Sequence, residues 1–203
     1  MVSSYPVQFD VDFPERKLDR LTTAIRLIAA IPILIVLSLL SGQTLNDDNR
    51  NTLVIGGAAV FLPLVLMLVV RQKYPRWWFD WNLNLLRFSN RVAAYLALLD
   101  DRYPSTDDEQ AVHLDFPYPD THQMNRWLPL VKWLLAIPHY VVLFFLWIAA
   151  LVSIVIAWFA ILFTGTYPRS LFNYVVGVLR WNNRVIAYAF TLVTDQYPPF
   201  SLR

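Results

Sequence analysis

Two clusters of arginine and asparagine share the spacing i, i+3, i+4. Residues with this spacing lie on one face of a helix, and guanidinium groups bind phosphate and carboxylate groups well. Trp81 and Trp181 accompany the clusters. The pattern predicts a surface that binds anionic lipid headgroups or a partner protein, at about 1 kcal/mol for each basic residue near an anionic leaflet. The clusters are Arg87, Asn90 and Arg91, and Arg180, Asn183 and Arg184.

The same arginines have a second interpretation, as orientation anchors or as partners of acidic groups within the chain. Arginine near a membrane surface commonly has such a role. Four aspartates are available for internal pairing, and the sequence leaves both interpretations open. They are Asp80, Asp100, Asp101 and Asp195.

His139 is an ionisable residue inside an apolar segment, which makes it a candidate for function. It follows Pro138, and we expect it near the middle of the third membrane helix. One interpretation is a structural histidine bonded to a carbonyl that the proline frees; another is a haem or quinone contact in a larger assembly. Arg26 and Lys132 lie near helix ends, where we expect their charges to reach the membrane surface.

The remaining chemistry is sparse. The chain has three histidines and no cysteine, so we expect neither a metal site nor a cofactor. Nucleotide-binding and hydrolase motifs do not occur. An enzyme would have to use His113, Asp115 and His122, which an ordinary solvated surface explains better. We therefore expect a protein without catalytic activity and without a nucleic-acid partner.

Long apolar segments must carry these side chains. Hydrophobic residues form 57% of the chain, which indicates a membrane protein. Segments 21–40 and 53–70 can each cross a hydrocarbon core of about 30 Å. Segment 127–164 is too long for one crossing, so we expect a tight hairpin that turns near 146–150. The sequence thus predicts four transmembrane helices.

The polar segments between them have regular patterns of their own. Residues 7–13 alternate between apolar and polar, and residues 111–116 do the same, so both predict short strands that could pair with each other. Segments 77–99 and 170–193 predict amphipathic helices at the bilayer interface. Together these features predict an all-α integral membrane fold with short β segments.

The sequence repeats itself. Tyr-Pro-Arg and the arginine cluster occur in both halves, which predicts one repeat at 1–104 and another at 105–203, each with a strand, a transmembrane hairpin and an amphipathic helix. Of the 17 Lys and Arg residues, only Arg50 falls between the first two membrane segments. The positive-inside tendency then places both termini in the cytoplasm.

The second half resembles a bacterial membrane family, domain of unknown function 4389. The resemblance rests on Ala-Ile-Pro-His at 136–139, Tyr-Pro-Arg at 167–169, VGVLRW at 176–181 and TDQYPPF at 194–200. The first half is a divergent version, with Ile33 in place of the histidine. The resemblance implies a multi-pass protein of the bacterial inner membrane and assigns no catalytic residue.

We therefore expect a non-catalytic scaffold, accessory or assembly subunit. Its expected partners are membrane lipids, other integral membrane proteins or further copies of itself. The alternative is a channel or transporter for lipid or small solutes, formed between repeats or protomers. A polar lining around His139, Tyr140 and Ser153 would favour the channel, and a dry interface would favour the scaffold.

Overall fold

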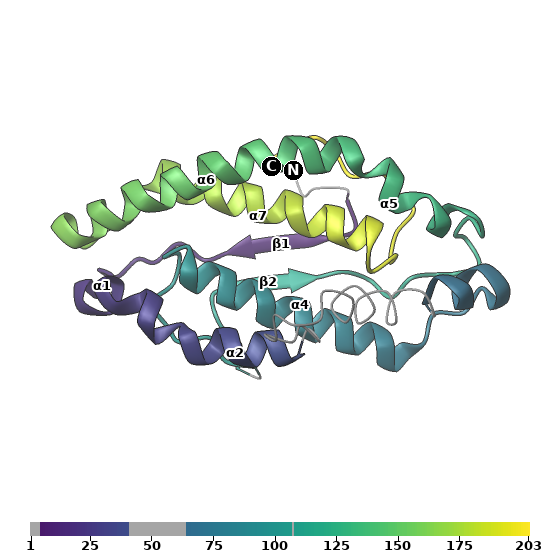
Figure 1. The fold of residues 1–203 in the computed structure, drawn as a ribbon, viewed down its shortest axis with the longest axis horizontal. Helices are drawn as coiled ribbons and strands as arrows, with labels where there is room; N and C mark the ends of the chain where they lie inside the picture. Colours follow the sequence, from purple (N-terminus) through teal and green to yellow (C-terminus); the bar gives the residue numbers. More distant parts are fainter. Residues whose placement is uncertain (1–4, 41–63, 107) are drawn as a thin grey trace, which may run out of the picture.

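The computed structural model describes residues 5–40, 64–106 and 108–203 of the chain (Figure 1). Residues 64–71 are helical. The remaining elements are β1 (Gln8–Val11), α1 (Arg20–Ala29), α2 (Ile31–Leu40), α4 (Arg76–Leu96), β2 (Val112–Asp115), the 3₁₀ helix η1 (Leu128–Leu130), α5 (Lys132–Leu135), α6 (Ile137–Thr164) and α7 (Arg169–Ala189).

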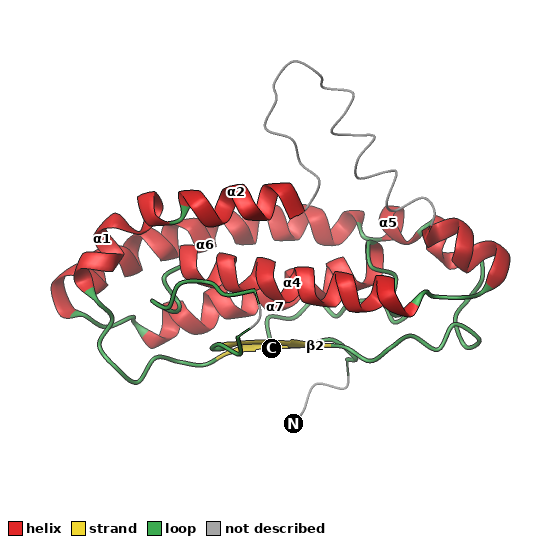
Figure 2. Cartoon of the chain, turned by 90° about the horizontal axis from the view of Figure 1, so that it is seen from below, coloured by secondary structure: helices red, strands yellow, loops and turns green. Residues whose placement is uncertain are grey.

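The elements form three layers (Figure 2). The apolar helices α1, α2, α5 and α6 make the first layer, α4 and α7 make the second, and the sheet makes the third. Helix α6 packs against α7 and α1, while the sheet packs against α4 and α7. The amphipathic helices are therefore sandwiched between an apolar layer and a polar strand pair.

The predicted pairing of the two strands is confirmed. Strands β1 and β2 are antiparallel, with Phe9 opposite Leu114 and Asp10 opposite His113. Phe9 and Leu114 are buried against the helices, whereas Asp10 and His113 are exposed. One residue in two faces the core, as the alternation in the sequence indicated.

Both apolar segments break at an alanine. Helices α1 and α2 meet at Ala30 with a bend of 41°, and α5 gives way to α6 at Ala136. Pro32 and Pro138 follow two residues later, and proline lacks the amide hydrogen that would continue the preceding turn. Segment 21–40 is therefore two helices that meet at a bend rather than one continuous helix.

The hairpin expected within 127–164 is also wrong. Helix α6 runs for 28 residues without a turn near 146–150, a length of about 42 Å. It contains no glycine, and its only proline is Pro138 in the first turn. It ends at Gly165, whose φ of 76° is the left-handed conformation that glycine tolerates.

Four transmembrane helices are not what the described residues show. Helix α6 is long and apolar enough to cross a membrane, and the bent pair α1–α2 would be a second such segment if it counted as one. These are the candidates within 5–40, 64–106 and 108–203. Of the predicted span 53–70, residues 53–63 lie outside the described part of the chain.

The two amphipathic helices occur where the sequence placed them. They end three or four residues earlier than expected, α4 at Leu96 and α7 at Ala189. Leu98 and Leu192 follow these ends with φ angles of 65° and 57°. A left-handed residue cannot continue a right-handed helix, so the chain turns there.

Candidate functional site

Asn90 and Asn183 join the two amphipathic helices. Each side-chain amide donates a hydrogen bond to the other's oxygen, at 2.8 Å from Asn90 and 2.7 Å from Asn183. Each also donates to the carbonyl four residues earlier, that of Leu86 or Leu179. Both asparagines are buried. These two predicted site residues therefore bind each other rather than an outside ligand.

Arg87 and Arg91 bind the second strand and the loop before it. Arg87 Nε donates to the Leu114 carbonyl at 2.9 Å, and Arg87 Nη2 lies 3.4 Å from Asp115 Oδ1. Arg91, which is buried, donates to the Ser105 carbonyl at 2.9 Å. The first arginine cluster thus holds α4 against the polar layer.

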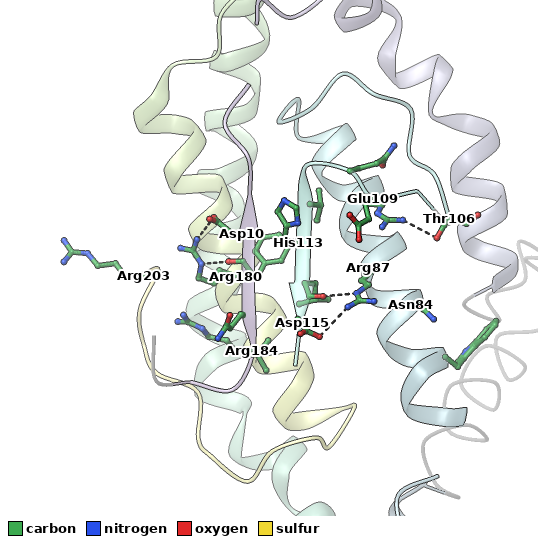
Figure 3. Close-up of a pocket in the computed structure, with 18 residues that line it drawn as sticks. Asp10, Asn84, Arg87, Thr106, Glu109, His113, Asp115, Arg180, Arg184 and Arg203 are labelled. Atoms are coloured by element: carbon green, nitrogen blue, oxygen red, sulfur yellow. Dashed lines mark hydrogen bonds and ion pairs between the residues drawn. The ribbon is translucent and has the colours of Figure 1, made fainter. Parts of the chain in front are cut away.

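Arg180 and Arg184 make the corresponding contacts for α7. Arg180 Nε donates to the Phe9 carbonyl at 2.8 Å, and its Nη2 donates to Asp10 Oδ1 at 2.9 Å. Arg184, at 1% exposure, donates to the Ser201 carbonyl at 3.3 Å. In Figure 3, Arg180 and Arg87 reach the strand pair from opposite sides.

The surroundings of Arg184 are electrostatically unusual. Burial lowers the pKa of its guanidinium, and the positive charge of Arg180 lowers it further, while Tyr5 partly opposes the shift. The Tyr5 ring lies 5.8 Å from the guanidinium carbon. The fold supplies carbonyl and aromatic acceptors in place of the water that this cation loses.

Arg26 and Lys132 were expected to extend their charges to the membrane surface, but both bind groups inside the protein. Both are buried, at 2% and 0% exposure. Arg26 Nη1 donates to the Asp100 carbonyl at 2.9 Å, and Lys132 Nζ lies 2.7 Å from Asp195 Oδ1. Their partners follow the amphipathic helices and are distant in sequence, which is why position along the apolar segment alone gave the wrong expectation.

His139 stands in the first turn of α6 rather than in its middle. The helix break at Ala136 separates it from residues 127–135, which explains the difference. Trp181 Nε1 donates to His139 Nδ1 at 3.0 Å, so the proton of neutral His139 is on Nε2. That atom is buried without a hydrogen-bond partner among the described residues. Phe200 stacks on the ring at 4.1 Å between centroids.

A groove of about 1070 Å³ crosses the outer face of the sheet. Trp81 lines it, whereas Trp181 is buried beside His139. The sequence singled out Asp115 only as a possible catalytic residue and did not place it in one groove with Asp10, although the period-two pattern could have placed both on the outer face. Its charged and histidine residues are Asp10, Arg87, Arg91, Glu109, His113, Asp115, Arg180, Arg184 and Arg203 (Figure 3).

The residues that an enzyme would need are not assembled into one site. His113 Nε2 lies 3.0 Å from Asp12 Oδ2 on the exposed face, and Asp115 pairs with Arg87. His122 is exposed in a separate turn. Within the described part of the chain, no three His, Asp or Glu residues are grouped so that they could hold a metal ion.

The face opposite the groove is apolar. Large hydrophobic side chains are exposed along α1, α2, α5 and α6. On a soluble monomer, the largest contiguous apolar patch is usually limited to about 300–600 Å². Such an exterior marks a membrane or protein contact. The most exposed residues on these four helices are Leu21, Leu27, Ile28, Leu39, Phe144, Phe145, Leu151 and Phe163.

Comparison with known proteins concerns the second half of the chain. Residues 127–201 match the family model described as Domain of unknown function (DUF4389). The match supports the resemblance expected for this segment and includes His139, Trp181 and the second arginine cluster. No curated protein and no solved structure matches the chain.

Proposed function

We propose that this chain is a non-catalytic membrane protein, a scaffold or accessory subunit that presents its apolar helices to lipid or to partner membrane proteins. One observation carries this proposal: the exposed apolar side chains gather on one face, and the charged groove occupies the other. A two-faced molecule of this kind suits a boundary between hydrocarbon and water.

The pairing of the charged residues supports a role without catalysis. On the strand face, Asp10 pairs with Arg180 and Asp115 pairs with Arg87. Both carboxylates are therefore engaged in contacts that hold the strands to the helices. The predicted binding arginines serve the fold, which leaves the apolar face as the better-supported contact surface for lipids or partners.

The division into two repeats belongs to the same proposal. Matching residues of the two halves make matching contacts: Arg26 and Lys132 each lie over a tyrosine, Tyr95 and Tyr188 respectively, at 4.6 and 5.3 Å. Location in a bacterial inner membrane with cytoplasmic termini remains the sequence-based proposal, whereas the multi-pass crossing expected from the sequence depends on how α6 is oriented in the bilayer. The apolar helix α6 supports membrane association.

A channel or transporter is less well supported. The face of α6 that is buried within the protein is mostly apolar, with Leu143, Ala150, Ala157 and Ile161. Ser153 donates its hydroxyl hydrogen to the Ala149 carbonyl of its own helix. The contact is thus apolar along most of its length, which is the arrangement expected of a scaffold.

Membrane flotation tests the proposal. The chain, expressed in bacteria, should float with lipid vesicles in a density gradient after a high-salt wash and should leave the membrane only with detergent. Phe145→Glu combined with Leu151→Glu should move much of it to the soluble fraction or to aggregates, because each charge enters hydrocarbon at a cost of several kcal/mol.

His113→Glu is the matched control, since His113 is exposed on the polar face, and this variant should float like the parent. A parent chain that stays soluble without detergent would overturn the proposal. For a parent chain that floats, native mass spectrometry of the detergent extract distinguishes a subunit with a stoichiometric companion from a homo-oligomer that carries lipid.

A further inference from the structure

Helix α6 and the charged sheet extend side by side along the molecule. Figures 1 and 2 share the long axis, and in both views the strand pair lies within the length of α6. The contacts agree, because α7 lies against α6 through Trp181 and His139 and binds β1 through the adjacent Arg180. The polar layer is therefore beneath α6 rather than beyond one of its ends.

This arrangement conflicts with a crossing by α6. If α6 stood along the bilayer normal, the outward residues of the sheet would lie at hydrocarbon depth. Each charged group there costs about 2.5–3.5 kcal/mol or more. The residues concerned are Asp10, Asp12, Asp115, Arg87 and Arg180, all on the strand face.

The thickness of the apolar layer fits a different arrangement. The layer is one helix deep, about 10 Å with side chains, whereas one leaflet contributes about 15 Å of hydrocarbon, half of the core. The exposed residues of α6 extend along its whole length, from Ile137 to Phe163. If α6 lay flat within one leaflet, the acyl chains of that leaflet would cover all of these residues.

The ends of the apolar layer have the residues of a membrane border. Arg20 donates to the Phe163 carbonyl at the end of α6. Arg126 donates to the Val70 carbonyl at the end of the helix 64–71. Trp127 is 65% exposed beside Arg126. Arg and Trp side chains at the ends of an apolar layer can extend to the anionic headgroup region.

We propose that the chain inserts into a single leaflet, with α6 parallel to the membrane plane. Helices α1, α2, α5 and α6 then lie among the acyl chains, while the sheet and its groove face the aqueous phase. The partner of the apolar face is thus lipid from one side of the bilayer. This inference rests on the membrane association proposed above and adds its geometry.

Cysteine labelling tests the geometry, and the chain has no cysteine of its own. Gln123→Cys and Thr166→Cys place exposed thiols before η1 and after α6. In sealed vesicles with a membrane-impermeant maleimide, both positions should label from the same side, and detergent should make every thiol accessible.

Labelling of the two positions from opposite sides would overturn the inference and leave membrane association standing. Failure of the parent chain to float would overturn both.

Spin labels along α6 give an independent measure of depth. Val141→Cys, Ile148→Cys and Val155→Cys are exposed positions seven residues apart, or about 10 Å at each step along the helix. Accessibility to oxygen and to a polar nickel chelate should report one common depth in vesicles with anionic lipid. A depth that changes by about 10 Å between neighbouring positions would show a crossing helix and refute the in-plane arrangement.

Discussion

Ile33 and His139 follow the two helix breaks at matching distances, and each belongs to an aromatic environment. Ile33 is in one buried apolar cluster with Phe88, whereas His139 accepts a hydrogen bond from Trp181. Phe88 and Trp181 also match between the halves. In the first half this contact is formed by two apolar side chains, and in the second half it is formed by a hydrogen-bonded pair.

The pair predicts strong coupling between His139 and Trp181. His139→Ile should destabilise the fold by about 1–3 kcal/mol, because the Trp181 N–H is left buried without an acceptor. His139→Ile combined with Trp181→Phe recreates the pair of the first half and should cost less than the sum of the single changes. Thermal unfolding in detergent measures all three variants, and strictly additive losses would contradict the coupling.

Single residues also show what the sequence could not reveal. The i, i+3, i+4 spacing placed Asn90 and Asn183 on helix faces, but their mutual hydrogen bonds depend on how α4 and α7 meet. The partners of Arg26 and Lys132 are likewise set by tertiary packing. Residue type predicted polar chemistry there, and only the fold shows that this chemistry is internal.

At the scale of the elements, α7 approaches the C-terminal segment closely at Gly177. A Cβ at Gly177 would lie 2.9 Å from both the Cβ and the carbonyl oxygen of Leu202. The Leu202 carbonyl accepts from Arg180 at 3.1 Å, which fixes the segment against the helix. The missing side chain of Gly177 is therefore a requirement of this contact.

Gly177→Ala should release the C-terminal segment while α7 stays helical. Alanine favours a helix over glycine by about 1 kcal/mol, but the overlap with the Leu202 backbone outweighs this gain. Carboxypeptidase should then remove the last residues faster than from the parent. Gly165→Ala is a control at the end of α6, where a Cβ meets only ordinary contacts and the strain comes from φ. Digestion of the C-terminal residues should stay at the parent rate in this variant. Unchanged digestion of Gly177→Ala would refute the argument.

For individual helices and strands, the sequence predicted some elements correctly and one incorrectly. Period-two alternation located β1 and β2, and amphipathic spacing located α4 and α7. The hairpin within 127–164 failed because it was argued from bilayer thickness, while nothing between Pro138 and Gly165 interrupts a helix. A helix that lies flat has no upper length set by the membrane.

Across the whole molecule, buried tyrosines connect segments from both halves. Tyr5 and Tyr74 donate to the carbonyls of Gln196 and Thr191, at 3.1 and 2.7 Å. Tyr74 and Tyr167 begin the two Tyr-Pro-Arg turns. Burial raises the pKa of all three phenols, so the fold holds them in the neutral form.

The raised pKa values predict loss of stability in alkali. A phenol whose pKa is higher in the folded state contributes fully below its unfolded pKa of about 10. As the pH rises further, the unfolded chain releases the proton first, and the free energy of unfolding falls by up to about 1.4 kcal/mol per pH unit for each tyrosine. Melting temperatures from about pH 8 to about pH 12 measure the slope.

Tyr74→Phe is the informative variant for this slope. It loses one hydrogen bond near neutral pH, at a cost of about 1 kcal/mol, and should show a shallower decline above about pH 10 than the parent. An equal decline in both chains would assign the alkaline transition to other groups.

The pairing of β1 with β2 also constrains how the protein can be made. About a hundred residues separate the partners. At a synthesis rate of roughly 5–20 residues per second, the second strand is made on the order of 5–20 s after the first. During that interval its edge is open to pairing with other chains. Synthesis close to the membrane, or a chaperone that holds the nascent strand, would shorten this exposure, and a stalled ribosome would lengthen it.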